Sequence, residues 1–402
     1  MSETTTPATD PIPDEDPGNE RTAAPHARAA LTALAAGGFG IGLTEFIISG
    51  LLSDVAESLR VSVPTAGALI WGYALAVAVG AFTVTAFLSR RPPKRALVVL
   101  LCLFIVGNVL TALAPTFDVA LLGRVVTAMC HGGYFGIGAV LAADLVAPHR
   151  RASAIAVMFT GLTAANVIGV PFGTVVGQHF GWRAAFWMVS VVGVVALVGI
   201  VALVPSRPAP TSSSGSAYRV LLRPQVLISI VLTMVLFGGV FGAFIYVEPL
   251  VTHVTGYPES AVPWLLIIFG LGLCVGNVVG GWAADRNLSL TLRTLPVLLT
   301  LTLVAYALLA HVPVAVAILL FVMGLVGFAT SPPLQLRVMH FAGDAPTMAS
   351  AANIAAFNVG NAIGTFLGGL TIGAGLGWVS PVWVGAGMAA AATVLAFATR
   401  HR

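Results

Sequence analysis

Charged residues are scarce in this sequence of 402 residues, in which Asp, Glu, Lys and Arg together make up 8%. Soluble domains carry about 25% charged residues, so this scarcity excludes a soluble globular fold. Hydrophobic residues make up 58% of the chain. Runs of about 20 apolar residues, enough to cross a bilayer, recur along almost its whole length. The composition therefore predicts an all-α membrane protein that has the lipid bilayer as its partner.

Cysteine is scarce as well. Cys102, Cys130 and Cys274 lie inside apolar runs without CxxC spacing, so we predict neither disulfides nor a metal site. Phosphate-binding Gly-x4-Gly-Lys-Ser/Thr loops and the GxSxG or HExxH patterns of hydrolases are absent. We therefore expect neither an enzyme nor a cofactor. Basic residues stand singly or in short breaks between apolar runs, which argues against a nucleic-acid partner.

Apolar runs separated by polar breaks predict twelve transmembrane helices. Residues 1–28, rich in Pro, Thr and acidic residues, are expected to form a disordered cytoplasmic tail before them. The expected helices cover residues 29–51, 64–88, 95–114, 117–142, 152–178, 184–204, 225–249, 260–283, 291–311, 313–336, 346–372 and 379–399.

The basic residues are unevenly divided between the two sides of these helices. Of nineteen Lys and Arg residues, sixteen fall on the side of the termini, only Arg60 and Arg183 fall on the other, and Arg124 lies within a span. Arg337 is counted among the sixteen as a loop residue. Because basic loops stay in the cytoplasm, we expect both termini there, with the protein in the inner membrane of a bacterium.

A Pro- and Ser-rich break at 205–224 has the composition of a flexible cytoplasmic linker. It divides the chain into two six-helix bundles, residues 29–204 and 225–399. The pattern Gly169-x3-Gly173-Thr-x2-Gly177 recurs as Gly360-x3-Gly364-Thr-x2-Gly368, roughly 190 residues later. This recurrence predicts that the bundles are pseudo-symmetric copies of one unit.

This organisation resembles the major facilitator superfamily. Three local patterns are similar to those of its twelve-helix drug:proton antiporter branch: Thr44-Glu45-Phe46, the segment from Arg124 to Gly132, and the segment from Asn166 to Gly173. Within that branch, chloramphenicol-resistance and sugar-efflux permeases are the most similar. The resemblance implies a secondary transporter that exports a small organic substrate, such as a chloramphenicol-like drug, in exchange for protons. We expect it to work as a monomer.

One loop departs from the family pattern. The family's Gly-x3-Asp-Arg sequence is kept only in the second half, as Gly281-x3-Asp285-Arg286, whereas Ser89-Arg90 stands in the first. The resemblance implies that such an Asp helps to gate the transport cycle, so we expect gating by Asp285 and Arg286.

The fifth predicted helix has its own gating candidates. Gly169, Pro171 and Gly173 are expected to permit close packing and bending at a gate, because Pro removes a backbone donor and Gly tolerates unusual dihedral angles.

Glu45 and Arg124 are the charged residues expected at matching depth within the spans. An ionised carboxylate about 9 Å deep costs several kcal/mol, so Glu45 must be paired, hydrated or protonated. Arg124 cannot lose its charge, so its burial requires an acceptor such as Glu45, backbone carbonyls or an anionic substrate. Relative movement of the two residues would switch proton affinity and so couple transport to protons. A static tether between helices is the alternative.

Five uncharged or weakly basic side chains in the spans are candidates for binding substrate. His131 could relay protons, bind substrate or simply pack in the core. Asn166 and Asn358 lie near the middles of equivalent helices, where transporter sites are found. Tyr73 and Tyr134 could offer aromatic surface to a flat ligand. Core packing and interhelical hydrogen bonds are the alternatives for all five.

Three functions fit the sequence. Proton-coupled export of a neutral compound is favoured, because few charges other than Glu45 and Arg124 are expected to be buried. A sugar or nucleoside exporter or facilitator of the same fold is the second. A membrane sensor or assembly partner that transports nothing is the third, and the lack of a sizeable aqueous domain argues against it.

Overall fold

The computed structural model describes residues 17–48, 51–61, 63–66, 68–209, 219–343 and 345–399. Every regular element within them is a helix, and eleven helical stretches are long and apolar enough to cross a membrane. One of these, α12 (Val262–Leu308), has 47 residues and a non-helical residue, Asn287, in its middle. At 1.5 Å per residue it is about 70 Å long, twice the hydrocarbon thickness. It therefore makes two spans, and the predicted twelve-helix fold is confirmed.

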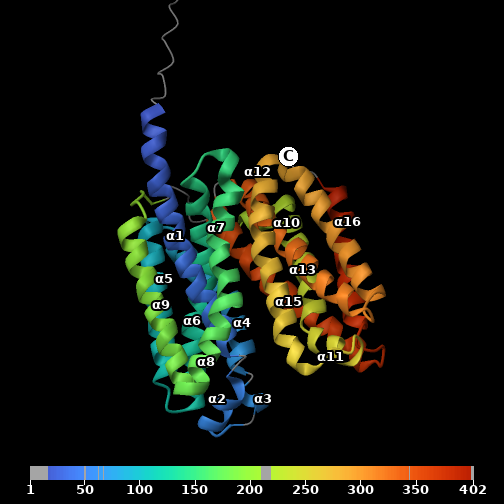
Figure 1. The fold of residues 1–402 in the computed structure, drawn as a ribbon. Coiled ribbons are helices and arrows are strands. Elements are labelled where there is room, and N and C mark those ends of the chain that lie inside the picture. The colour runs from blue at the N-terminus through green and yellow to red at the C-terminus, as the bar shows by residue number, and fades with distance from the viewer. Residues whose placement is uncertain are drawn as a thin grey trace, which may run out of the picture.

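Six spans form the first bundle, coloured blue to green in Figure 1. The fifth span is interrupted by one π-helical turn, and short helices precede or follow the spans. In chain order the elements are α1 (Pro17–Ile47), α2 (Leu52–Ser58), α3 (Val63–Ala66), α4 (Ala68–Leu88), α5 (Pro93–Ala112), α6 (Phe117–Asp144), η2 (Pro148–Arg150), α7 (Arg151–Ala164), η3 (Ala165–Gly169), α8 (Val170–Phe180) and α9 (Trp182–Leu203).

The second bundle, yellow to red in Figure 1, repeats this arrangement. Its elements are η4 (Arg219–Leu222), α10 (Pro224–Phe244), α11 (Val247–His253), η5 (Glu259–Ala261), α12, α13 (Pro313–Ala329), α14 (Ser331–Ala342), α15 (Pro346–Gly373) and α16 (Ser380–Ala398). Helix α1 begins and α16 ends on the same side of the molecule. We call this side the termini face and the other the far face.

Three boundaries differ from those predicted. Helix α1 begins at Pro17, so residues 17–28 are helical and not part of a disordered tail. The remaining tail residues 1–16 and linker residues 210–218 lie outside the described part of the chain. The expected loop at 284–290 is a kink at Asn287, whose Oδ1 accepts a hydrogen bond from the Leu290 amide at 2.9 Å. Arg337, predicted in a loop, is fully buried in α14.

The repeated glycine pattern has the same packing role in both bundles. In the fifth span, a Cβ at Gly169 would lie 3.0 Å from the Phe39 ring of α1, and one at Gly173 would collide with another α1 side chain. In α15, a Cβ at Gly360 or Gly364 would collide with carbonyl oxygens of α10. Each glycine row thus lets one span approach the first span of its own bundle.

The bundles touch each other along two junctions that start at the termini face. At the first, α7 packs against α12, and a Cβ at Gly281 would lie 2.7 Å from the Ala156 Cβ. At the second, α4 and α6 pack against α15, and a Cβ at Gly136 would lie 2.9 Å from the Ala351 Cβ. Small residues therefore bring the backbones of the two bundles into contact on this side.

Candidate functional site

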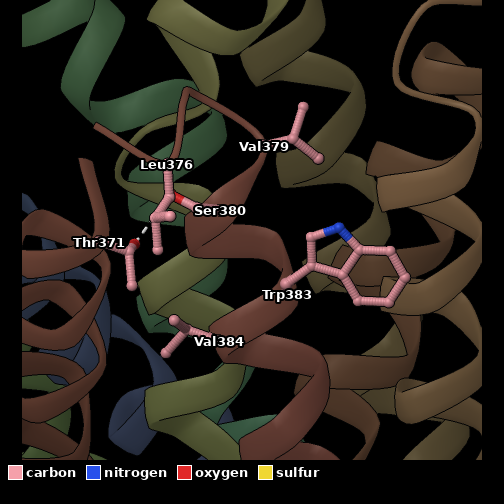
Figure 2. Close-up of a pocket in the computed structure, with 6 residues that line it drawn as sticks. All are labelled: Thr371, Leu376, Val379, Ser380, Trp383 and Val384. Atoms are coloured by element: carbon pink, nitrogen blue, oxygen red, sulfur yellow. Dashed lines mark hydrogen bonds between the residues drawn. The ribbon is translucent and has the colours of Figure 1, made fainter. Parts of the chain in front are cut away.

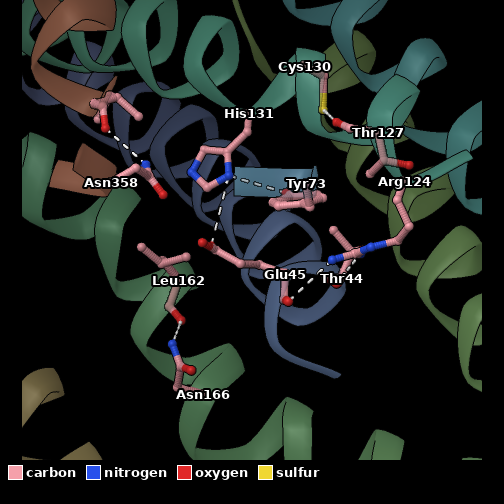
Figure 3. A network of polar contacts seen from close by, with 11 residues as sticks. Thr44, Glu45, Tyr73, Arg124, Thr127, Cys130, His131, Leu162, Asn166 and Asn358 are labelled. Carbon is pink, nitrogen blue, oxygen red and sulfur yellow. Dashed lines mark hydrogen bonds and ion pairs between the residues drawn. The ribbon is translucent and has the colours of Figure 1, made fainter. Parts of the chain in front are cut away.

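Glu45 lies in the last turn of α1. Its side chain is 18% exposed. Its Oε2 atom is 3.9 Å from Nδ1 of His131 on α6. Figure 3 shows the carboxyl pointing toward His131 and away from the Arg124 guanidinium. Within the described residues, the acid of the first span therefore has a histidine as its basic neighbour.

Arg124 is 1% exposed and donates hydrogen bonds to three main-chain oxygens and, from Nη1 at 3.3 Å, to the Thr44 hydroxyl. Its Nη1 bonds the Thr44 carbonyl at 2.6 Å, Nη2 bonds the Glu45 carbonyl at 3.5 Å, and Nε bonds the Leu69 carbonyl of α4 at 3.1 Å. In the described part of the chain it forms no ion pair with a carboxylate. Of the three acceptors expected from the sequence, the structure thus selects backbone carbonyls.

The guanidinium also lies over an aromatic ring. Its Cζ is 4.2 Å from the centroid of Tyr73 on α4, a cation–π contact of about 0.5–2 kcal/mol. The guanidinium group of Arg124 therefore joins α6 to both α1 and α4. These contacts fix the cation in place, which leaves the carboxyl of Glu45 as the side chain that can move relative to it.

Tyr73 and His131 complete a short polar chain. The Tyr73 hydroxyl is 3.3 Å from Nδ1 of His131, the same nitrogen that faces Glu45. Both side chains are nearly inaccessible, with 2% and 4% exposure. One imidazole nitrogen thus lies between a phenol and a carboxyl, an arrangement that can hold or pass a single proton.

Asn108 on α5 is a residue of this network that was not predicted. The Thr44 hydroxyl donates to Asn108 Oδ1 at 2.6 Å, and Asn108 Nδ2 donates to the Phe104 carbonyl at 2.9 Å. Asn108 and Thr44 are both 0% exposed. The asparagine therefore fixes the α1 turn that carries Glu45. An Asn within a long apolar run was the only signal for it in the sequence.

The other predicted substrate residues fall into two groups. Asn166 on η3 and Asn358 on α15 are half-buried, and each amide nitrogen bonds a carbonyl of its own helix, at 3.1 and 3.0 Å. Both lie on the Glu45 carboxyl side in the view of Figure 3. Tyr134, by contrast, is fully buried, and its hydroxyl donates to the Leu34 carbonyl at 3.0 Å. Tyr134 thus joins α6 to α1, as the core-packing alternative for this residue requires.

Asp285, on α12 of the second bundle, accepts hydrogen bonds from α7 of the first bundle. Its Oδ1 accepts from the Ala152 amide at 2.7 Å and its Oδ2 from the Ser153 amide at 2.9 Å, at the start of α7. These amides have no partner within their own helix, so a carboxylate there satisfies them and the helix dipole together. Arg286 lies 3.5 Å over the Trp282 ring of its own helix.

A second polar contact lies deeper in the same junction. Asn277 Nδ2 donates to the Ala156 carbonyl at 2.6 Å and to the Thr160 hydroxyl at 3.1 Å. The α4–α15 junction differs, because Ser89 bonds only the Ala86 carbonyl of its own helix. Buried Thr85, on the same helix, has no partner for its hydroxyl oxygen. The hydrogen bonds that close the termini face are therefore concentrated at α7 and α12.

The fifth span is irregular beside its predicted gating residues. Its π-helical turn, Ala165–Gly169, carries Asn166 and ends where the α8 segment begins, with Pro171 in the first turn of α8. A π turn widens the helix and interrupts its regular bonding, as is frequent at functional sites. The helix is thus irregular at Gly169, and bending at a gate there stays a prediction.

A second buried arginine was also missed. Arg337 on α14 donates to the Ser229 hydroxyl and, at 3.1 Å, to Gln225 Oε1, both on α10. Beside it, Asn353 bonds Gln335 at 2.8 Å. These contacts tie together α10, α14 and α15 and account for the burial of a basic residue that sequence patterns assign to a loop.

A cavity of about 470 Å³ lies elsewhere, between the far-face ends of α15 and α16. Figure 2 shows its lining, formed by Thr371, Leu376, Val379, Ser380, Trp383 and Val384. Its two hydroxyls bond each other at 2.9 Å, and none of these residues is acidic or basic. We therefore place the chemistry of the protein at the Glu45 network and not in this cavity.

Comparison with known proteins decides the family. The sequence matches the Major Facilitator Superfamily over residues 34–356 and 249–402. The chain belongs to this superfamily. It is 41% identical to the inner membrane transport protein YdhP of Escherichia coli, across 92% of this chain and 96% of YdhP. It is 34% identical to a chloramphenicol resistance protein of Streptomyces lividans, across 90% of this chain and 93% of that protein.

Solved structures agree on the fold of this superfamily member. The transporter FucP in the outward conformation aligns with a TM-score of 0.76 at 13% identity, covering 92% of this chain and 98% of FucP. The proton:xylose symporter XylE aligns with a TM-score of 0.75 at 14% identity, covering 93% of this chain and 96% of XylE. The protein is thus a secondary transporter of a small molecule, and its family is not one of enzymes.

Proposed function

We propose that this transporter exports a small, neutral organic compound in exchange for protons and belongs to the drug:proton antiporter branch. The observation that carries the proposal is the partly exposed Glu45 carboxyl, which lies 3.9 Å from His131 and, within the described residues, makes no ion pair with Arg124. Because the guanidinium is fixed by carbonyls of α1 and α4, Glu45 can exchange between a protonated state beside His131 and an ionised state drawn toward Arg124. Substrate and proton then compete for one site.

Alternating access would work against the junctions at the termini face. Asp285 and Asn277 hold α7 to α12 while that face is closed. Opening it requires these hydrogen bonds to break, and the irregular fifth span, with Gly169, Pro171 and Gly173, gives the moving helix its bend. The gate would thus depend on the second-half Asp285 and Arg286, since the hydroxyl of Ser89 donates to the Ala86 carbonyl of its own bundle.

We place the protein in the inner membrane of a bacterium, with both termini in the cytoplasm, acting as a monomer. The excess of basic residues on the termini side supports this orientation, and the relative YdhP is an inner membrane protein by name. With that orientation, the structure has its cytoplasmic side closed. Residues 1–28 and the 205–224 linker would then lie in the cytoplasm.

A chloramphenicol-like drug is our candidate substrate, on the basis of the 34% identical resistance protein. The site supports an uncharged ligand, because its one fixed cation already bonds three carbonyls. His131, Tyr73, Asn166 and Asn358 are the polar groups that would bind it.

The test is transport in proteoliposomes with an imposed pH gradient. Wild-type protein should drive chloramphenicol uphill, and Glu45→Gln should retain only downhill exchange, because an amide cannot release a proton. Glu57→Gln on α2 is the matched control, since Glu57 is an exposed carboxyl. Uphill transport by Glu45→Gln at the wild-type rate would refute proton coupling through this residue.

A further inference from the structure

Six phenylalanines gather in the second bundle, from four different spans. Phe237, Phe241 and Phe244 lie on α10, and one ring each comes from α12, α13 and α15. We call this set, Phe237, Phe241, Phe244, Phe269, Phe328 and Phe357, the phenylalanine cluster. None of the six was a predicted site residue, because a single Phe in an apolar span is unremarkable by sequence.

The rings contact each other in a continuous series. Phe237 lies at its centre, with its centroid 4.2 Å from Phe357 and 5.5 Å from Phe328. Phe241 follows one helical turn later, 6.1 Å from Phe237 and 6.1 Å from Phe244. Phe244 then stacks on Phe269 at 3.9 Å with 16° between the planes. Rings at such distances attract each other and form one aromatic surface.

Burial is lowest in the middle of this series. Phe237 and Phe269 are 5% and 2% exposed, whereas Phe241 and Phe244 are only half-buried. Residues 237, 241 and 244 share one face of α10, and that face meets rings from three other spans. The glycines of α10 occupy different faces, Gly238 against α15 and Gly239 against α16. The half-buried rings therefore lie on the face of α10 that meets α12 and α13.

Two cluster members adjoin residues at the bundle interface. Phe269 precedes Gly270, where a Cβ would lie 2.8 Å from the Val167 side chain of η3 in the first bundle. Val167 in turn follows Asn166. Phe357 precedes Asn358, which Figure 3 draws on the carboxyl side of Glu45. Asn358 and Asn166, the two amides already proposed to bind substrate, thus stand next in sequence to Phe357 and to Val167.

The two bundles differ sharply in charge beside this interface. The first contributes Glu45, Arg124 and His131. In the second, the span segments that carry the cluster contain no Asp, Glu, Lys or Arg: residues 224–244, 262–284, 313–329 and 346–373. A ligand between the bundles would thus meet polar groups on one side and aromatic rings on the other.

We propose that the phenylalanine cluster is the apolar wall of the substrate site and that the substrate is a neutral molecule with an aromatic ring and a polar end. The ring packs on Phe241 and Phe244, and the polar end reaches the Glu45 network through Asn358 and Asn166. The inference rests on the proposed transport function and specifies its substrate class. Filling of the bundle core explains Phe237 and Phe269, but not the exposure retained by the other two α10 rings.

The experiment compares aromatic ligands with saturated counterparts of equal size. Binding of phenyl β-D-glucoside and of cyclohexyl β-D-glucoside, with chloramphenicol as a third probe, is measured by calorimetry on the purified full chain in nanodiscs. Wild-type protein should prefer the phenyl compound by about two- to tenfold, the usual range for one aromatic pair. Phe241→Leu and Phe244→Leu keep the apolar volume but remove a ring, so each should reduce that preference toward one.

Matched controls are Phe104→Leu and Phe186→Leu, two fully buried rings of the first bundle, which should keep the preference. Equal affinity for phenyl and cyclohexyl probes in wild type, or an unchanged preference in both α10 variants, would overturn the proposal. The two failures are distinguishable: an unchanged phenyl preference in both α10 variants overturns only this inference, whereas uphill transport by Glu45→Gln at the wild-type rate overturns the proposed function.

Discussion

Removal of the Asp285 carboxylate should open the termini face. Asp285 accepts two hydrogen bonds, at 2.7 and 2.9 Å, from amides at the start of α7. A hydrogen bond to a charged group contributes about 1.5–3 kcal/mol, and a carboxylate at a helix start adds about 0.3–1 kcal/mol when exposed. Asp285 is half-buried, and water replaces part of what is lost, so we expect Asp285→Ala to cost the closed state about 2–3 kcal/mol. This corresponds to a shift of roughly 30- to 150-fold in the equilibrium.

The assay is a distance distribution between spin labels at Arg91 and Leu290, two exposed positions at the termini ends of opposite bundles. Cys102, Cys130 and Cys274 are first replaced so that labelling is specific. Wild type should populate a short distance, and Asp285→Ala should move most molecules to a longer one.

Ser89→Ala is the matched control for this measurement. Ser89 occupies the equivalent loop in the first half but bonds only its own helix, at 3.2 Å. Its removal should leave the distribution as in wild type. If Asp285→Ala also leaves the distribution unchanged, the α7–α12 hydrogen bonds do not set the conformational equilibrium, and the proposed gate is wrong.

Substitutions at three further residues test the network around Glu45. Arg124→Lys keeps the charge but loses the fork that reaches both Thr44 and Leu69, so thermal unfolding should show a loss of about 2–4 kcal/mol. Asn108→Ala removes the acceptor of the Thr44 hydroxyl, which keeps only the 3.3 Å hydrogen bond that it accepts from Arg124, and should cost about 1–3 kcal/mol, while Asn108→Asp should restore part of it. Tyr73→Phe removes the hydroxyl beside His131 and should change the pH profile of transport without lowering expression; an unchanged profile would remove Tyr73 from the proton path.

The fold was predictable because the bilayer imposes a simple rule on sequence. Each span must be about 20 apolar residues long, and polar residues collect where the chain leaves the lipid. This rule fails for a polar residue that is buried inside the protein and hydrogen-bonded to side chains of other helices. Arg337 is fully buried because Ser229 and Gln225 of another helix accept its hydrogen bonds, and no local pattern reveals partners about a hundred residues away.

The site was only partly predictable for a related reason. Buried Glu45 and Arg124 are conspicuous in any apolar run, but their partners depend on which way each side chain turns. The structure pairs Arg124 with carbonyl oxygens and Glu45 with His131, where sequence alone left direct pairing of the two equally open. Tyr134 and Tyr73 show the same limit, since one hydroxyl bonds a buried carbonyl and the other faces the site.

The kinked and irregular helices were beyond sequence patterns. Asn287 is the one non-helical residue between two spans, and its side chain accepts a hydrogen bond from the first turn of the second span. The polar residues there had predicted a loop over 284–290. The π-helical turn at Ala165–Gly169 lies in a run whose composition is that of an ordinary helix. In both cases contacts with the other bundle, at Asp285 and at Val167, accompany the irregularity.

The central claim is that the Glu45 carboxyl takes up and releases a proton during transport. Infrared difference spectroscopy of the protein in nanodiscs tests it directly, because protonated and ionised carboxyls absorb at different frequencies. A protonated carboxyl band that disappears when chloramphenicol binds, or when the pH is raised within the range of transport activity, and that is absent from Glu45→Gln, is the predicted result. A Glu45 that stays ionised at every pH at which the protein transports would contradict the account.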